Sequence, residues 1–201
     1  MLSLNNFSAR ELRSLRAMNT PAKIQKFLDD IPYHLADTAW SPRQVLEHRS
    51  AHCLEGAIFA AAALRVNGYP PLVLDLEAEK DTDHVLAVYQ QNGCWGAVAS
   101  SNYSTCRFRS PVYRSLRELA LSYFEGYFNL RGERTLRTFS RPVNLTRFDK
   151  QNWMTTTDPV WFIADYLLDI PHTRLMTPGV ERGLTRVDRR LFEAGLHGKR
   201  D

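Results

Sequence analysis

The chain has few cysteines, no long apolar run and no low-complexity segment. Each of these absences excludes a class of protein. Three cysteines in 201 residues, an odd number, do not make a disulfide framework. We therefore expect a reducing compartment, the cytoplasm, in which the thiols stay free. The longest apolar run, residues 57–64, is too short to cross a bilayer, and the first residues lack the basic and apolar segments of a secretory signal. We expect no membrane association.

A strong excess of charge is also missing. The formal net charge is +4, and residues 1–130 carry 13 basic and 13 acidic side chains. Residues 131–201 carry 13 basic and 9 acidic side chains, so they hold the whole excess. These basic residues alternate with acids, as in Asp188-Arg189-Arg190, and no row of aromatic residues accompanies them. This pattern favours a solvated helical surface, and we do not expect nucleic-acid binding.

What the chain does contain is a predicted helix that is apolar on all sides. It covers residues 51–66, is rich in alanine, and is followed by Asn67-Gly68, a pair typical of a helix C-terminus. A helix without a polar face is buried, and its small side chains allow other elements to approach closely. We expect it to pack against a sheet. Shorter helices are expected before it. They start at the capping residues Ser8, Thr20 and Ser41, the last two of which are followed by proline.

Aliphatic runs after this helix predict a sheet. Strands are expected at residues 72–76, 84–89 and 94–98, with Asn92-Gly93 as the hairpin turn between the last two. A further strand is expected at 105–109, before Pro111, and another at 134–139. The rest of the chain reads as helices, at 159–168 and 179–194. The predicted class is α+β, with a core domain at residues 1–130 and a mainly helical extension at 131–201 that packs on it.

Cys53 is the candidate nucleophile. If Ser50 caps the central helix, Cys53 is the third residue of the helix and lies in its first turn, where unpaired N–H groups and the helix dipole favour a thiolate. The N–H of Cys53 can donate to an oxyanion, with Gln44 or His48 as candidates for a second donor. A cysteine in an apolar helix can also be a plain core residue, and Cys94 and Cys106 read as packing residues.

His84 is the candidate base, since it opens the strand that follows the acidic loop. A thiol with a histidine base is the minimum equipment for acyl transfer. A two-residue turn at Asn92-Gly93 would set Ser101 opposite His84, whereas a three-residue turn would set Ser100 opposite and Asn102 diagonal. We favour Asn102 as the group that orients the imidazole, because an amide oxygen is the better acceptor, and keep Ser100 and Ser101 as alternatives.

A zinc site at His52, Cys53 and His84 is the competing interpretation. Adjacent residues on a helix point in directions about 100° apart, so His52 and Cys53 rarely share a metal ion. We therefore expect no metal and no cofactor.

Several motifs together resemble a known superfamily. They are Ser41-Pro42-Arg43 before the cysteine helix, Gly68-Tyr69-Pro70-Pro71 before a strand, Asp83-His84-Val85 on a strand, and Trp95 on the return strand. Over residues 38–128 the chain is similar to the transglutaminase-like fold of the papain-like cysteine enzymes. Its members include protein crosslinkers, peptidases and deglycosylating amidases.

This resemblance implies a Cys–His–Asp triad, in which Cys53 matches the nucleophile and His84 the base. The sequence has Ala99-Ser100-Ser101-Asn102 where the family usually has the acid, and Ala51 where it commonly has glycine. A neutral asparagine can still orient the base, although it stabilises an imidazolium less than a carboxylate does.

The sequence therefore predicts a cysteine protease-like hydrolase or acyltransferase that acts on a peptide, a protein or a small amide through Cys53, His84 and Asn102. The alternative is a catalytically inactive transglutaminase-like domain that binds a peptide or a partner protein.

Overall fold

The N-terminal helices begin at the capping residues that the sequence predicts. The computed structural model describes residues 6–200. Ser8 accepts a hydrogen bond from the backbone N–H of Glu11, whose carboxylate returns to the Ser8 N–H, and Thr20 and Ser41 cap the next two helices. Each cap satisfies N–H groups that a helix leaves unpaired. The α-helices in this part of the chain are α1 (Ala9–Ala17), α2 (Pro21–Asp29), α3 (Pro42–His48), α4 (Cys53–Val66), α5 (Leu116–Phe124), α6 (Trp161–Asp169), α7 (Pro178–Arg182) and α8 (Arg189–Leu196).

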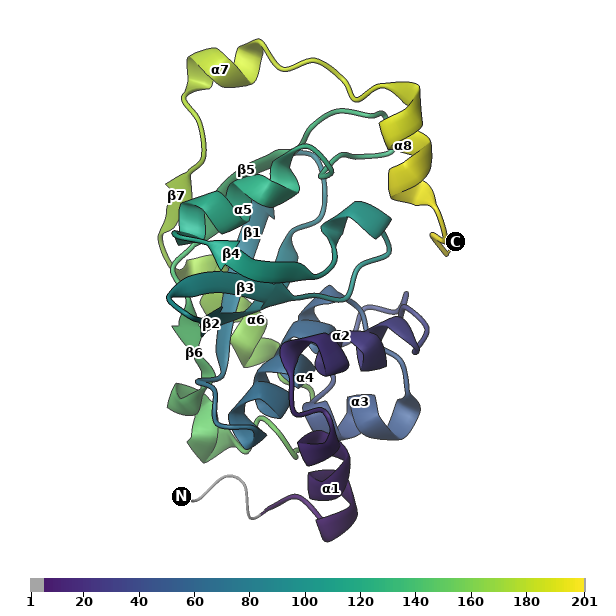
Figure 1. Ribbon diagram of the computed structural model, residues 1–201, viewed down its shortest axis with the longest axis vertical. Coiled ribbons are helices and arrows are strands. Elements are labelled where there is room, and N and C mark those ends of the chain that lie inside the picture. The colour runs from purple at the N-terminus through teal and green to yellow at the C-terminus, as the bar shows by residue number, and fades with distance from the viewer. Residues whose placement is uncertain (1–5, 201) are drawn as a thin grey trace.

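An antiparallel sheet of seven strands lies at the centre (Figure 1). Its strands are β1 (Leu72–Ala78), β2 (His84–Gln91), β3 (Cys94–Val98), β4 (Arg109–Tyr113), β5 (Leu136–Ser140), β6 (Val143–Asn144) and β7 (His172–Arg174). The order across the sheet is β4-β3-β2-β1-β5-β7, and β6 pairs with the first residues of β1 beside β5. Within the described residues, the 3-10 segments Ser104–Cys106 and Leu145–Gln151 lie outside the sheet.

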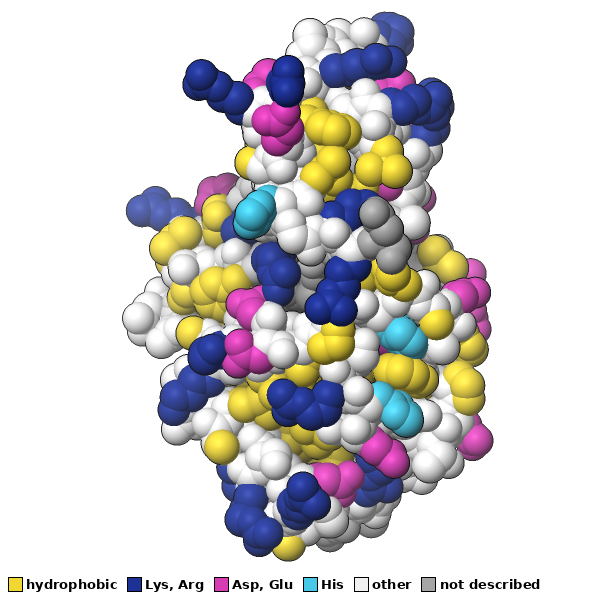
Figure 2. Space-filling model, turned by 90° about the vertical axis from the view of Figure 1, so that its right-hand side faces the viewer, with side chains coloured by type: hydrophobic (Ala, Val, Ile, Leu, Met, Phe, Trp, Pro, Cys, Tyr) yellow, Lys and Arg dark blue, Asp and Glu magenta, His cyan; other side chains and the backbone are white. Residues whose placement is uncertain are grey.

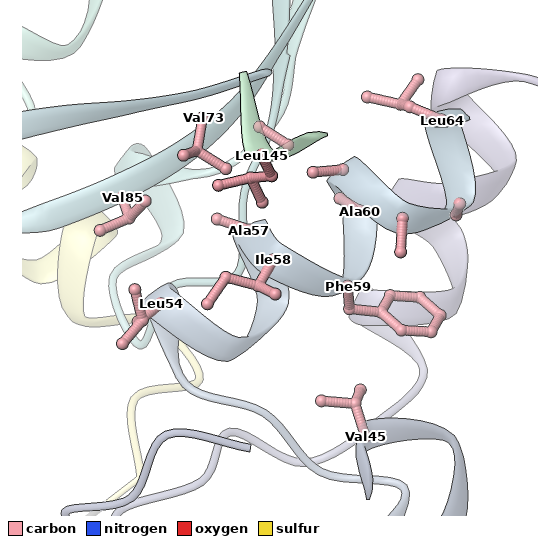
Figure 3. Packing of buried hydrophobic residues seen from close by; sticks show 14 of the residues in the cluster. Val45, Leu54, Ala57, Ile58, Phe59, Ala60, Leu64, Val73, Val85 and Leu145 are labelled. Carbon is pink, nitrogen blue, oxygen red and sulfur yellow. The ribbon is translucent and has the colours of Figure 1, made fainter. Parts of the chain in front are cut away.

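Helix α4 fills the space between the sheet and the N-terminal helices, as its apolar sequence predicts. Every residue from Leu54 to Leu64 is buried. Figure 3 shows Val73 of β1 and Val85 of β2 on one side of the helix and Val45 of α3 on the other. Because both sides of α4 are covered, the helix needs no polar face.

The two faces of the sheet carry separate hydrophobic clusters. Val85, Ala87 and Tyr89 of β2 belong to the cluster around α4. The alternate residues Leu86 and Val88 belong to the cluster around α5. This alternation decides on which face the side chain at position 84 lies.

The hairpin between β2 and β3 has the two-residue turn. Asn92 and Gly93 both have positive φ, at 51° and 76°, as a type I′ turn requires. Gln91 pairs with Cys94 and Ala87 with Val98, where the ladder ends. Extended further, this register would set Ser101 opposite His84, so Asn102 does not take the diagonal place on which its predicted role depended.

One strand prediction needs correction. The strand expected at 105–109 is a 3-10 turn, and β4 begins at Arg109 and runs through Pro111. Proline has no N–H to donate, but β4 lies at the edge of the sheet, where one side needs no partner.

The prediction that the chain beyond residue 130 is mainly helical was also incomplete. Besides the expected β5, the short strands β6 and β7 join the same sheet. The helix expected at 179–194 is two helices, because α7 ends at Gly183 and α8 starts at a new cap, Asp188. The division at residue 130 stays a prediction, although strands on both sides of it share one sheet.

Basic side chains are scattered over the face that carries α8 and the N-terminal helices. Figure 2 shows Lys and Arg in separate groups on this face, with acidic and apolar side chains between them.

Within residues 6–200, no helix has the length and apolar content needed to span a membrane.

Candidate functional site

Cys53 is the first residue of α4 and not, as predicted, the third. The cap is His52, because the preceding backbone is held extended: Ala51 forms a parallel bridge with Tyr33, and its N–H donates to the Pro32 carbonyl over 3.3 Å. The hydroxyl of Ser50, the expected cap, donates to the same carbonyl over 3.0 Å. Cys53 still lies among unpaired N–H groups, at the positive end of the helix dipole.

The surroundings of Cys53 favour the neutral thiol. The side chain is partly exposed, and Sγ lies 3.9 Å from the carbonyl oxygen of Asp83, to which the thiol donates. Burial raises the pKa of the Cys53 thiol, against the lowering effect of the Val85 and Leu54 backbone and of the Tyr33 hydroxyl. The helix N-terminus alone therefore does not make a thiolate here, because desolvation outweighs it.

His84 is buried on the face of the sheet opposite to α4. It has the same parity along β2 as Leu86 and Val88, and its ring lies between Tyr123 and Tyr127, with ring centroids 6.4 and 6.3 Å away. Burial, with a smaller contribution from the charge of Arg109, lowers the pKa of His84 to about 4. The imidazole is therefore neutral at pH 7.

The tautomer of His84 follows from its hydrogen bond. Nε2 lies 2.8 Å from the carbonyl oxygen of Cys106, which can only accept, so Nε2 carries the proton. In a neutral ring the lone pair is then on Nδ1, which forms no hydrogen bond with residues 6–200. His84 is thus oriented by a backbone carbonyl and holds a free basic nitrogen.

Cys53 and His84 line the same cavity, at the start of β2. Its volume is about 210 Å³, and its walls include Tyr33, Asp83 and Tyr127. Cys53 comes from α4, which packs on one face of the sheet, and His84 comes from the first position of β2, on the other face with Leu86 and Val88. In the described part of the chain no hydrogen bond joins Sγ to the imidazole.

Asn102 also lines this cavity, but its amide is used elsewhere. Nδ2 donates to the Arg200 carbonyl and Oδ1 accepts from the Arg200 N–H, each over 2.9 Å. Of the two alternatives, Ser101 lines the cavity and accepts from the Tyr103 N–H, whereas Ser100 donates to the Ala51 carbonyl over 3.2 Å. The structure therefore brings Asn102 near the site without a hydrogen bond to His84.

Neither side chain considered as a second oxyanion donor lines the cavity. Gln44 belongs to the cap of α3 and donates to the Thr157 carbonyl, and His48 packs on Trp40. Tyr33 does line it and interacts with the thiol through its hydroxyl. No local sequence pattern points to Tyr33, because a long-range bridge between Tyr33 and Ala51 brings it beside Cys53.

Glu55, in the first turn of α4, anchors the end of the helix that carries Cys53. Its side chain is fully buried and accepts hydrogen bonds from the Thr38 hydroxyl at 2.6 Å, the Trp40 N–H at 3.0 Å and the His52 N–H at 3.1 Å. His34 Nδ1 lies 3.1 Å from the same carboxylate. These contacts tie the residues before α4 to its first turn and so fix the direction of the Cys53 side chain.

Residues 6–200 contain no group of three or more His, Cys, Asp or Glu side chains placed to hold a metal ion. Cys53, Cys94 and Cys106 are all free thiols. No protein-family model and no curated protein matches this chain.

Proposed function

We propose that this protein is a cysteine-dependent hydrolase or acyltransferase that acts on an amide or peptide carbonyl. One observation carries the proposal: the thiol of Cys53, at a helix N-terminus, and a neutral imidazole with a free Nδ1 line one cavity of about 210 Å³. The resemblance to transglutaminase-like enzymes supports the same roles for both residues. A reducing cytoplasm would keep the thiol free.

In this proposal Cys53 attacks the substrate carbonyl as its proton moves to Nδ1 of His84. The carbonyl oxygen becomes an oxyanion, for which the N–H groups at the start of α4 and the Tyr33 hydroxyl are the candidate donors. The leaving amine takes the proton from His84, and a thioester remains on Sγ. Water, or a second amine, then attacks the thioester with His84 again as the base and releases the thiol.

The protonation states favour general-base attack over a resting ion pair. The pKa of Cys53 is raised and that of His84 is lowered, so both groups are neutral before substrate binds. The Cys106 carbonyl orients His84 as an asparagine would, but it adds no negative charge to stabilise an imidazolium.

An activated ester tests the proposal without knowledge of the substrate. Mixed with p-nitrophenyl acetate, the protein should release a burst of one p-nitrophenolate per chain, and mass spectrometry should find the acetyl group on Cys53. His84→Gln should slow the burst by about 10²-fold. Because the pKa of His84 is about 4, protonation of the base should not slow the burst between pH 8 and pH 5.

Cys94→Ser is the matched control, since Cys94 is partly exposed, lies in β3 and lines no part of the cavity. It should leave the burst unchanged. Acetylation of Cys53 that proceeds at the same rate in His84→Gln would contradict the role of His84, and acetylation spread evenly over the cysteines would contradict the site.

A second function is favoured by one specific observation. Cys53 donates to the Asp83 carbonyl, and no hydrogen bond within residues 6–200 joins it to His84. This arrangement suits a catalytically inactive transglutaminase-like domain that binds a peptide or a partner protein. Such a domain would give no burst, and Cys53→Ala would keep its binding.

A further inference from the structure

His197, Gly198 and Arg200 form one wall of a groove that adjoins the Cys53 cavity. The groove has a volume of about 190 Å³ and is lined by His197, Gly198 and Arg200 together with residues of the body of the protein. It shares Tyr33, Ser101 and Asn102 with the Cys53 cavity. The groove and the candidate catalytic cavity are therefore neighbours with a common wall.

The side chain of Asn102 binds the backbone of Arg200 and not its side chain. One amide donates to the Arg200 carbonyl and accepts from the N–H of the same residue, each over 2.9 Å. This is the pairing that one strand residue offers to another, so any residue except proline would fit it.

A second side chain of the same loop also binds backbone. The Ser104 hydroxyl donates to the Ala194 carbonyl, in the last turn of α8. Asn102 and Ser104 thus hold two points of one chain segment, and both use groups that every peptide has.

The segment reaches Asn102 through a tight turn. The Lys199 N–H donates to the Leu196 carbonyl over 2.9 Å, and Gly198 has a φ of +76°. Glycine adopts this conformation at little cost, whereas a β-branched residue does not. Helix α8 itself is held by Phe192 and Gly195, which pack on Phe128 of the cavity wall.

We propose that this groove is a subsite for an extended peptide, clamped through its backbone by Asn102, and that residues 197–200 act as a built-in competitor because Arg200 occupies the Asn102 amide at the wall of the groove. This inference rests on the proposed function and narrows its substrate class to a peptide chain that runs past Asn102 toward Cys53. The segment has to release Asn102 before a peptide can bind there.

Binding of a peptide in trans tests the proposal. The probe is a fluorescent peptide with the sequence of residues 194–200, Ala-Gly-Leu-His-Gly-Lys-Arg. Its affinity is measured by fluorescence polarisation on the full chain with Cys53→Ala, so that no chemistry takes part. Gly198→Val on this background should strain the turn, release the segment and increase the affinity at least about fivefold over the parent.

Gly179→Val is the matched control, because Gly179 lies in α7, where an added Cβ meets only Thr177 Oγ1 at 3.8 Å and an arginine nitrogen at 3.9 Å. It should leave the affinity unchanged. Asn102→Leu added to Gly198→Val should abolish the gain. A second probe carries an N-methyl group on the backbone nitrogen of its arginine and so lacks the N–H from which Asn102 accepts. It should bind to Gly198→Val about tenfold more weakly than the plain probe does.

Equal affinity of the parent and Gly198→Val, or equal affinity of the plain and methylated probes, would overturn the proposal. The acetylation burst of the unmodified protein reports separately on the proposed function. A burst without peptide binding would refute the subsite alone, and peptide binding without a burst would refute the enzyme alone.

Discussion

At the scale of single residues, Glu55 lies in an environment that its position in the sequence does not predict. An acidic residue in the first turn of a helix is ordinarily solvated and favours the helix dipole. Glu55 is instead fully buried and accepts from one hydroxyl and two backbone N–H groups, with His34 beside it. It holds the segment before α4 in place, and the position of Cys53 depends on that segment.

We expect Glu55→Gln to lower the free energy of unfolding by about 2–4 kcal/mol, because the amide group would turn an N–H₂ toward donors and remove the charge they bind. Urea denaturation at pH 7 measures the loss. Glu47→Gln, at an exposed position in α3, is the control and should stay within about 0.5 kcal/mol of the parent. A parent-like stability for Glu55→Gln would mean that the buried carboxylate contributes little.

At the scale of elements, the close contact between α4 and the end of β3 depends on a helical glycine. A Cβ on Gly56 would lie 2.5 Å from Cβ of Ser100, whose hydroxyl in turn donates to the Ala51 carbonyl. The helix and the loop that follows β3 therefore meet almost backbone to backbone. This contact places residues 100–102 beside the first turn of α4.

Two effects oppose each other in Gly56→Ala. Alanine stabilises a helix by about 1 kcal/mol relative to glycine, whereas overpacking costs about 1–3 kcal/mol. Since the clash is with Cβ of a buried serine, which cannot rotate away, we expect net destabilisation of about 1–2 kcal/mol. Thermal unfolding measures it. The same change at Gly179 meets nothing closer than 3.8 Å and should be neutral or stabilising. A stabilised Gly56→Ala would show that α4 can move away from the loop freely.

The elements that local signals control were predictable, and the ones that tertiary contacts control were not. Asn67-Gly68 and Asn92-Gly93 mark the end of α4 and the β2–β3 turn through their backbone preferences alone. β7 has only three residues, two of them exposed, so no periodicity identifies it. The same division holds in the site. Helix and strand patterns predicted that Cys53 lies at the start of a helix and His84 at the start of a strand. The Cys106 carbonyl that orients His84 has no sequence signal, since every residue has a carbonyl.

At the scale of the whole molecule, the sheet joins strands from before and after residue 130. β1 pairs with β2 on one side and with β5 and β6 on the other. Trp153, which is fully buried, lies in the same hydrophobic cluster as α4. The residues after 130 thus complete the core that the residues before them begin.

A fragment of residues 1–130 should therefore lack a cooperative thermal transition, because it loses the strands on one whole side of β1 and the side chains packed on α4. Circular dichroism during heating checks this expectation. A chain that ends at residue 188 and lacks only α8 is the control and should keep its transition. A cooperative melt of the 1–130 fragment would establish the two-part division that the sequence predicts.

Cys53 belongs to α4, which packs on one face of the sheet, and His84 belongs to β2 and lies on the other face with Leu86 and Val88. The distance between sulfur and imidazole is consequently a measure of how the α4 layer is registered against the layer of the sheet. Any substitution or ligand that slides one layer by a fraction of an ångström would tune the pair without touching either residue, so reactivity and interlayer alignment should vary together.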